Sequence, residues 1–160
     1  MPNPCFAQLS DTSRPLLDKF YRAQGSSMRA AAGARLWVAR APQIIAGLSL
    51  SSVAEGNWLT GLFVDPAWRN QAIARRLIEQ ASAQCQGPIW LFCHPDLLGF
   101  YQKLGFSHAT ALPQALADRL ARYSRSKPLI ALVCQSPAGS RSGNSTSVKP
   151  NLLKSLMRDG

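Results

Sequence analysis

The chain has 160 residues, the usual length of one domain, and 46% of them are hydrophobic, so a packed core can form. Its formal net charge of +10 favours contact with anions such as nucleic acid, acidic membrane surfaces or a phosphorylated cofactor. The apolar runs are too short for a membrane span, and four scattered cysteines beside two histidines argue against a zinc site. The cysteine spacing and the lack of a secretory signal favour reduced thiols and a cytoplasmic protein.

The first half of the chain is predicted to form an antiparallel meander with one helix. Ser13 is a good helix N-cap, Pro15 suits the first turn, and Gly25 suits the end. Alternating apolar residues predict the strands, and the stretch 26–33 is left open as a loop or a short helix. The expected elements are a strand at 5–9, a helix from Ser13, strands at 34–40, 44–54 and 58–64, and a hairpin turn at Glu55-Gly56-Asn57.

The second half is predicted to continue with alternating helices and strands. An apolar stripe indicates a helix over 69–85, and the continuous apolar run at 88–93 is typical of a strand buried on both faces. The remaining expected elements are a helix from Asp96 to Gly105, a strand at 107–112, a helix at 114–125 and a closing strand at 128–134. Residues 58–93 then form a parallel βαβ unit. The fold class is α/β (α+β), with a domain over 1–135 and a basic, Ser/Gly-rich, flexible tail over 136–160.

An anion site is predicted where the strand at 58–64 leads into the following helix. Orphan N–H groups at a helix N-terminus bind anions. Three arginines surround this terminus, and small residues at Ala72 and Ala74 allow a ligand to approach the backbone; the arginines are Arg69, Arg75 and Arg76. These features suit a diphosphate.

Two ordered motifs resemble those of GNAT-type N-acetyltransferases. After Val64-Asp65-Pro66, the stretch Arg69-Asn70-Gln71-Ala72-Ile73-Ala74 is similar to the family's pyrophosphate loop R/Q-x-x-G-x-G/A. Further on, Tyr101-Gln102-Lys103-Leu104-Gly105-Phe106 is similar to its Tyr-x-x-x-Gly-Phe signature. The family pattern departs at Ala72, which replaces a glycine, and at His94, where many members have Asn. Alanine at position 72 costs about 1 kcal/mol if φ is positive there, and nothing if the backbone is ordinary helix.

The resemblance implies a GNAT-like mixed central sheet, a meander joined to the βαβ unit, with helices on both faces. It implies direct transfer of acetyl from acetyl-CoA to a primary amine, without a metal. Pantetheine would pair with Leu62, Phe63 and Val64, where a backbone N–H would stabilise the oxyanion. The diphosphate would lie on Arg69, Asn70, Gln71, Ala72, Ile73, Ala74 and Arg75. Tyr101 would protonate the departing thiolate, because a phenol of ordinary pKa near 10 is protonated at neutral pH.

Several alternatives remain open from the residues alone. Tyr101 could be a core aromatic, and the arginines could be solvated helix charges. His94 could be a strand-end histidine, a CoA contact or the general base, and Glu55 could be a base or a plain turn residue. The fold could also hold an acyl-CoA without turnover. Association of the basic tail with nucleic acid and formation of a homodimer are left open, whereas no membrane association is expected.

Overall fold

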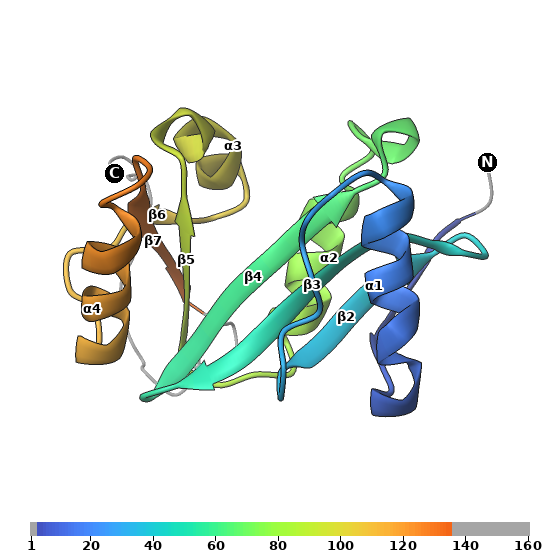
Figure 1. Cartoon of the computed structure of the whole chain (residues 1–160). Coiled ribbons are helices and arrows are strands. Elements are labelled where there is room, and N and C mark those ends of the chain that lie inside the picture. Colours follow the sequence, from blue (N-terminus) through green and yellow to red (C-terminus); the bar gives the residue numbers. More distant parts are fainter. Residues whose placement is uncertain (1–2, 136–160) are drawn as a thin grey trace. The chain divides into compact units, whose positions relative to one another are not determined.

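The computed structural model describes residues 3–135, and the tail predicted over 136–160 lies outside them (Figure 1). The chain divides into two compact units. Among the described residues, the first unit holds 3–51 together with Leu59–Gln84, and the second holds Ser52–Trp58 and 85–135. The strand that contains Gly56–Val64 contributes to both units.

The first unit contains the predicted meander and two helices. Its elements are β1 (Cys5–Leu9), α1 (Arg14–Ala23), β2 (Arg35–Arg40), β3 (Ile44–Val53), most of β4 (Gly56–Val64) and α2 (Ile73–Ser82). The strands follow one another in the order β1-β2-β3-β4, and β2 pairs antiparallel with both β1 and β3. The stretch 26–33, left open by the sequence, contains no helix.

Helices cover both faces of the sheet in this unit, with α1 in front and α2 behind in Figure 1. The α1 side is an apolar cluster in which Leu17 and Tyr21 lie with Leu36 and Val38 of β2. On the other side, α2 buries an apolar stripe and contacts β1 and β2. The alternating residues of β2 are therefore buried on both faces, with Trp37 buried as well as Leu36 and Val38.

The predicted hairpin turn is displaced by one to two residues. The turn consists of Ala54 and Glu55, and Ala54 takes the positive φ of 48°. Gly56 and Asn57 instead belong to β4. A Cβ on Gly56 would lie 2.6 Å from the carbonyl oxygen of Pro88, so glycine is needed there for close approach of two strands rather than for a turn.

The helix predicted over 69–85 is shorter at both ends. Pro66–Trp68 forms a 3-10 turn, and α2 begins only at Ile73. The backbone cannot be helical before that point, because Asn70 and Ala72 have φ values of 67° and 60°.

The second unit contains the remaining elements. These are the first residues of β4, β5 (Pro88–Cys93), α3 (Leu98–Lys103), β6 (Ser107–His108), α4 (Gln114–Tyr123) and β7 (Ile130–Gln135). Asn57 and Trp58 of β4 pair in parallel with Ile89 and Trp90 of β5, as the predicted βαβ unit requires. The strand order here is β4-β5-β7-β6, with antiparallel β5–β7 and β6–β7 pairs.

Three details of the second unit differ from expectation. Asp96 does not start α3, because Pro95–Leu97 forms a separate 3-10 turn before it. The strand expected over 107–112 is reduced to two residues. The last strand lies between β5 and β6 rather than at the margin, because β6 adds to its free side. The predicted class is nevertheless confirmed: the strands form a mixed seven-stranded sheet with helices. No helix among residues 3–135 is long and apolar enough to span a membrane.

Candidate functional site

The start of α2 is an uncapped helix N-terminus. Ala72 occupies the N-cap position in a left-handed conformation and has no side chain that could accept a hydrogen bond. The first turn carries no acidic residue. The N–H groups of Ile73 and Ala74 consequently have no acceptor within the helix, and the helix dipole adds a partial positive charge there.

The segment before α2 is held in place by its own polar contacts. Asp65 Oδ1 accepts a hydrogen bond from the Ala67 N–H at 2.9 Å and thereby starts the 3-10 turn. Arg69 Nε donates to the carbonyl of Val64 at 3.0 Å, and its guanidinium lies 5.4 Å from the ring centroid of Phe63. Arg69 is therefore fixed beside the end of β4, and it remains exposed.

The three arginines predicted around this terminus do not share one environment. Arg69 and Arg75 are exposed at the start of α2, as are Asn70 and Gln71. Arg76 instead stacks over the Phe6 ring of β1, 4.5 Å from its centroid. The structure thus groups Arg69 and Arg75 with the helix terminus, whereas Arg76 contacts β1.

The end of β4 is half-buried and irregular. Leu62, Phe63 and Val64 are partly exposed, and Phe63 packs edge-on against Phe20 of α1 with centroids 6.0 Å apart. Just before them, Gly61 has a φ of 70°, which a regular strand does not adopt. The carbonyl of Gly61 accepts a hydrogen bond from the hydroxyl of Tyr21 at 2.5 Å. Neither residue was singled out from the sequence, although a glycine within an apolar strand is a known signal of irregularity.

In the second unit, Tyr101 lies on α3 among aromatic rings. Its ring packs edge-on against Phe100 and Phe106, with centroids 5.0 and 5.8 Å away. Burial, and secondarily the nearby Cys93, raises the pKa of Tyr101 to about 12. The phenol of Tyr101 is therefore protonated at neutral pH and able to donate a hydrogen bond.

His94 directly follows β5 and caps the next turn. Its Nδ1 accepts a hydrogen bond from the Asp96 N–H at 3.0 Å, and the imidazole is exposed. A neutral imidazole that accepts at Nδ1 carries its proton on Nε2. Glu55 is exposed in the hairpin turn of the same unit. Among residues 3–135 no cluster of three His, Cys, Asp or Glu side chains could hold a metal ion.

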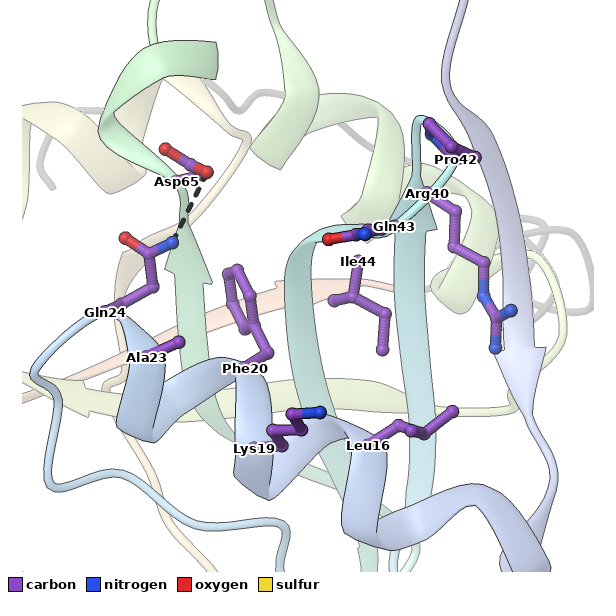
Figure 2. Close-up of a pocket in the computed structure, with 10 residues that line it drawn as sticks. All are labelled: Leu16, Lys19, Phe20, Ala23, Gln24, Arg40, Pro42, Gln43, Ile44 and Asp65. Carbon is purple, nitrogen blue, oxygen red and sulfur yellow. Dashed lines mark hydrogen bonds between the residues drawn. The ribbon is translucent and has the colours of Figure 1, made fainter.

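A shallow pocket of about 460 Å³ lies on the α1 side of the first unit (Figure 2). Asp65 and Gln24 lie at one end, where Gln24 Nε2 donates to Asp65 Oδ2 at 3.3 Å. Phe20 and Ile44 lie between them and Arg40, which is drawn at the opposite end. The pocket contains none of the residues predicted from the two motifs.

Comparison with known proteins supports the family resemblance that the two motifs predicted. Residues 32–108, a little under half of the chain, match the family model described as an acetyltransferase (GNAT) domain. Residues 32–108 therefore resemble a GNAT acetyltransferase domain, as the two motifs predicted, and this match supports acyl transfer as the general chemistry. A comparison with curated protein sequences found no significant match.

Solved structures share the fold at low sequence identity. ElaA from Escherichia coli is 16% identical with a TM-score of 0.59, covering 84% of this chain and 100% of its own. The ribosomal-protein-S18-alanine N-acetyltransferase of the same organism is 14% identical with a TM-score of 0.56, covering 90% and 99%. The N-acetylglutamate synthase of Neisseria gonorrhoeae, solved with coenzyme A and N-acetyl-glutamate, is 15% identical with a TM-score of 0.61, covering 85% of this chain and 36% of its own.

Proposed function

We propose that the protein transfers acetyl from acetyl-CoA directly to a primary amine. The observation that carries this proposal is the uncapped α2 terminus, which follows two left-handed residues and stands beside an arginine held against the end of β4. The GNAT domain supports acyl transfer in general. Coenzyme A is present in the related gonococcal structure, and we extend that ligand class to this chain.

The residues at the start of α2 fit a diphosphate in three respects. The N–H groups of Ile73 and Ala74 begin the helix, the first turn carries no carboxylate that would oppose an anion, and Arg69 and Arg75 are both exposed. Asn70 and Ala72 have left-handed backbone conformations, and a left-handed residue beside a right-handed one is the arrangement that forms anion nests from successive N–H groups. In this proposal the diphosphate seat comprises Arg69, Asn70, Gln71, Ala72, Ile73, Ala74 and Arg75.

Acetyl-CoA supplies a thioester whose carbonyl carbon a neutral amine attacks, so that a C–N bond forms and the C–S bond breaks. A backbone N–H of Leu62, Phe63 or Val64 stabilises the negative charge on the carbonyl oxygen. Tyr101 donates its proton to the departing thiolate, and its raised pKa keeps that proton in place at neutral pH. The amine gives up its proton to water or to a base, and we keep His94 as the candidate because its imidazole is exposed.

Titration of the full chain with acetyl-CoA tests the proposal. We expect saturable binding with one site per chain, and Arg69→Ala should weaken it by about tenfold because one charged contact to phosphate is lost. Arg22→Ala is the matched control, because Arg22 is an exposed arginine of α1 that removes the same charge elsewhere in the unit.

Absence of binding at millimolar acetyl-CoA would exclude this function. Binding without release of thiol against a broad panel of primary amines would favour the alternative of an acyl-CoA-binding module. One observation favours that alternative: β4 carries no carboxylate that could act as the general base.

A further inference from the structure

A fully buried tyrosine contacts the proposed cofactor strand from outside the sheet. Tyr21 lies on α1 and is 0% exposed. Buried hydroxyls almost always have a hydrogen-bond partner. Here the partner is the main-chain carbonyl of Gly61, 2.5 Å away in β4.

The Gly61 carbonyl can accept the Tyr21 hydrogen bond because the backbone of β4 is irregular at Gly61. In a regular strand φ is strongly negative and the carbonyl joins the ladder with a neighbouring strand. At Gly61 φ is 70° instead. A Cβ at this position would lie only 2.8 Å from the Tyr21 hydroxyl, so both the backbone conformation and the contact require glycine.

The helix that carries Tyr21 is itself firmly anchored to the first unit. Asp18 accepts a hydrogen bond from the Ala30 N–H at 2.8 Å, and Arg14 donates to the carbonyls of Ala34, at 3.0 Å, and Ala31. The tyrosine ring is packed against Phe20, with centroids 5.9 Å apart. Burial, and secondarily the charge of Asp18, raises the pKa of the phenol, so its proton stays on the oxygen.

We propose that Tyr21 is a positioning residue for acyl transfer: its hydroxyl holds the Gly61 carbonyl out of the ladder and thereby sets the direction of the N–H groups of Leu62, Phe63 and Val64. This inference rests on the proposed function, because it assigns those N–H groups to the thioester carbonyl and the pantetheine. It does not involve the diphosphate seat, which belongs to the start of α2. Tyr21 therefore affects transfer more than binding of coenzyme A.

The test uses Tyr21→Phe in the full chain, which keeps the ring and removes only the hydroxyl. Amide hydrogen exchange over 61–64 should become about tenfold or more faster, since a buried carbonyl loses its partner. The kcat with the best amine of the panel should fall by about tenfold to a hundredfold, because displacement of positioned donors weakens transition-state stabilisation. The Kd for coenzyme A should change by less than about threefold, with one site per chain retained. Tyr123→Phe, which removes an exposed tyrosine hydroxyl of α4, should change none of these quantities.

The number of coenzyme A sites per chain separates positioning from simple unfolding. If kcat falls only in proportion to the number of sites, Tyr21 is merely structural and the inference is overturned. Unchanged kcat and unchanged exchange over 61–64 would overturn it as well. Gly61→Ala provides the second variant: it keeps the phenol but opposes the positive φ, and it should reproduce the loss of kcat. If the wild-type chain binds no acetyl-CoA, the proposed function fails, whereas wild-type turnover with an unaffected Tyr21→Phe variant overturns only the role of Tyr21.

Discussion

Replacement of Ala72 by glycine should stabilise the protein, because alanine occupies a left-handed conformation there. The φ of Ala72 is 60° and its side chain is exposed, so the substitution relieves backbone strain without removing a packed methyl group. A left-handed residue other than glycine costs roughly 1–2 kcal/mol, whereas the added freedom of glycine in the unfolded chain offsets about 0.4–1 kcal/mol of that relief. The expected net gain is about 0.5–1 kcal/mol, or a Tm higher by about 1–4 °C for a chain of this length.

Two further alanines of the chain provide matched controls in urea and thermal unfolding. Ala54 is also exposed, with a φ of 48° in the hairpin turn, so Ala54→Gly should stabilise by a similar amount. Ala83 is exposed with a φ of −65° at the end of α2, so Ala83→Gly should destabilise by about 0.5–1 kcal/mol. In addition, only Ala72→Gly removes a methyl group from the proposed diphosphate seat, so only this variant should increase the affinity for acetyl-CoA, whereas Ala54→Gly should raise the Tm and leave that affinity unchanged.

The sign of the stability change in Ala72→Gly tests whether the backbone before α2 is left-handed. If Ala72→Gly destabilises the protein as Ala83→Gly does, the backbone before α2 is not left-handed. The anion nest inferred from that backbone would then be wrong, even if acetyl-CoA binds. A gain for both Ala54→Gly and Ala72→Gly, against a loss for Ala83→Gly, is the pattern that the φ values predict.

Three other substitutions address the chemistry and the stability of the second unit and of β1. Tyr101→Phe should lower turnover by about tenfold or more with acetyl-CoA affinity nearly intact, measured by thiol release beside calorimetry; a large loss of affinity would make Tyr101 a cofactor contact. The pKa of this phenol is raised to about 12, so its protonation contributes to stability below about pH 10, and this contribution is lost as the pH rises through 12. The free energy of unfolding should therefore fall less between pH 10 and 12 in Tyr101→Phe than in the wild type. Cys5 is the one fully exposed thiol among the four cysteines, because Cys85 and Cys93 are buried and Cys134 is half-buried. Cys5→Ser should therefore remove the fast phase of thiol titration at neutral pH, and a surviving fast phase would mean that another thiol is accessible. Asn57→Ala should lower the free energy of unfolding in urea by about 2–3 kcal/mol. The Asn57 amide is 3% exposed and donates to the carbonyl of Gln86 at 2.8 Å, and the substitution leaves this carbonyl unpaired. A loss below about 0.5 kcal/mol would mean that the Gln86 carbonyl bonds to water instead.

The periodicity of the sequence was sufficient to predict most elements, because their apolar faces pack as the pattern requires. The β2 strand and α2 bury the residues that alternation and the helical stripe select. The errors occur where backbone conformation is set by local geometry. Residues 69–72 have a composition compatible with helix, yet Asn70 and Ala72 adopt positive φ; asparagine is enriched in that region, whereas alanine gives no such signal. Gly56 suggested a turn by its identity, whereas its function is to allow the close approach of Pro88.

In the candidate site, too, some features were predictable from the sequence pattern and others depend on contacts that the pattern does not reveal. Motif spacing located Arg69, Ala72 and Tyr101, and the structure supplies a helix terminus and a raised phenol pKa at those places. The spacing could not distinguish Arg76, whose guanidinium stacks on Phe6, because that contact joins residues seventy positions apart. The role proposed for Tyr21 could not be predicted for the same reason, because it depends on a hydrogen bond to Gly61, forty positions away in the sequence.

The two left-handed positions beside the proposed acyl-CoA site explain why the chain keeps glycine at one and tolerates alanine at the other. At Gly61 the strain of a positive φ would be added to a 2.8 Å contact between a new Cβ and the Tyr21 hydroxyl, inside a buried interface that cannot relax freely. At Ala72 the side chain is exposed, so only the backbone term remains, and about 1 kcal/mol is tolerable in a domain of ordinary stability. Gly61→Ala should therefore destabilise by more than Ala72→Gly stabilises. A similar magnitude for both would mean that α1 moves away from β4 at little cost, and Tyr21 could then not hold the strand in a fixed conformation.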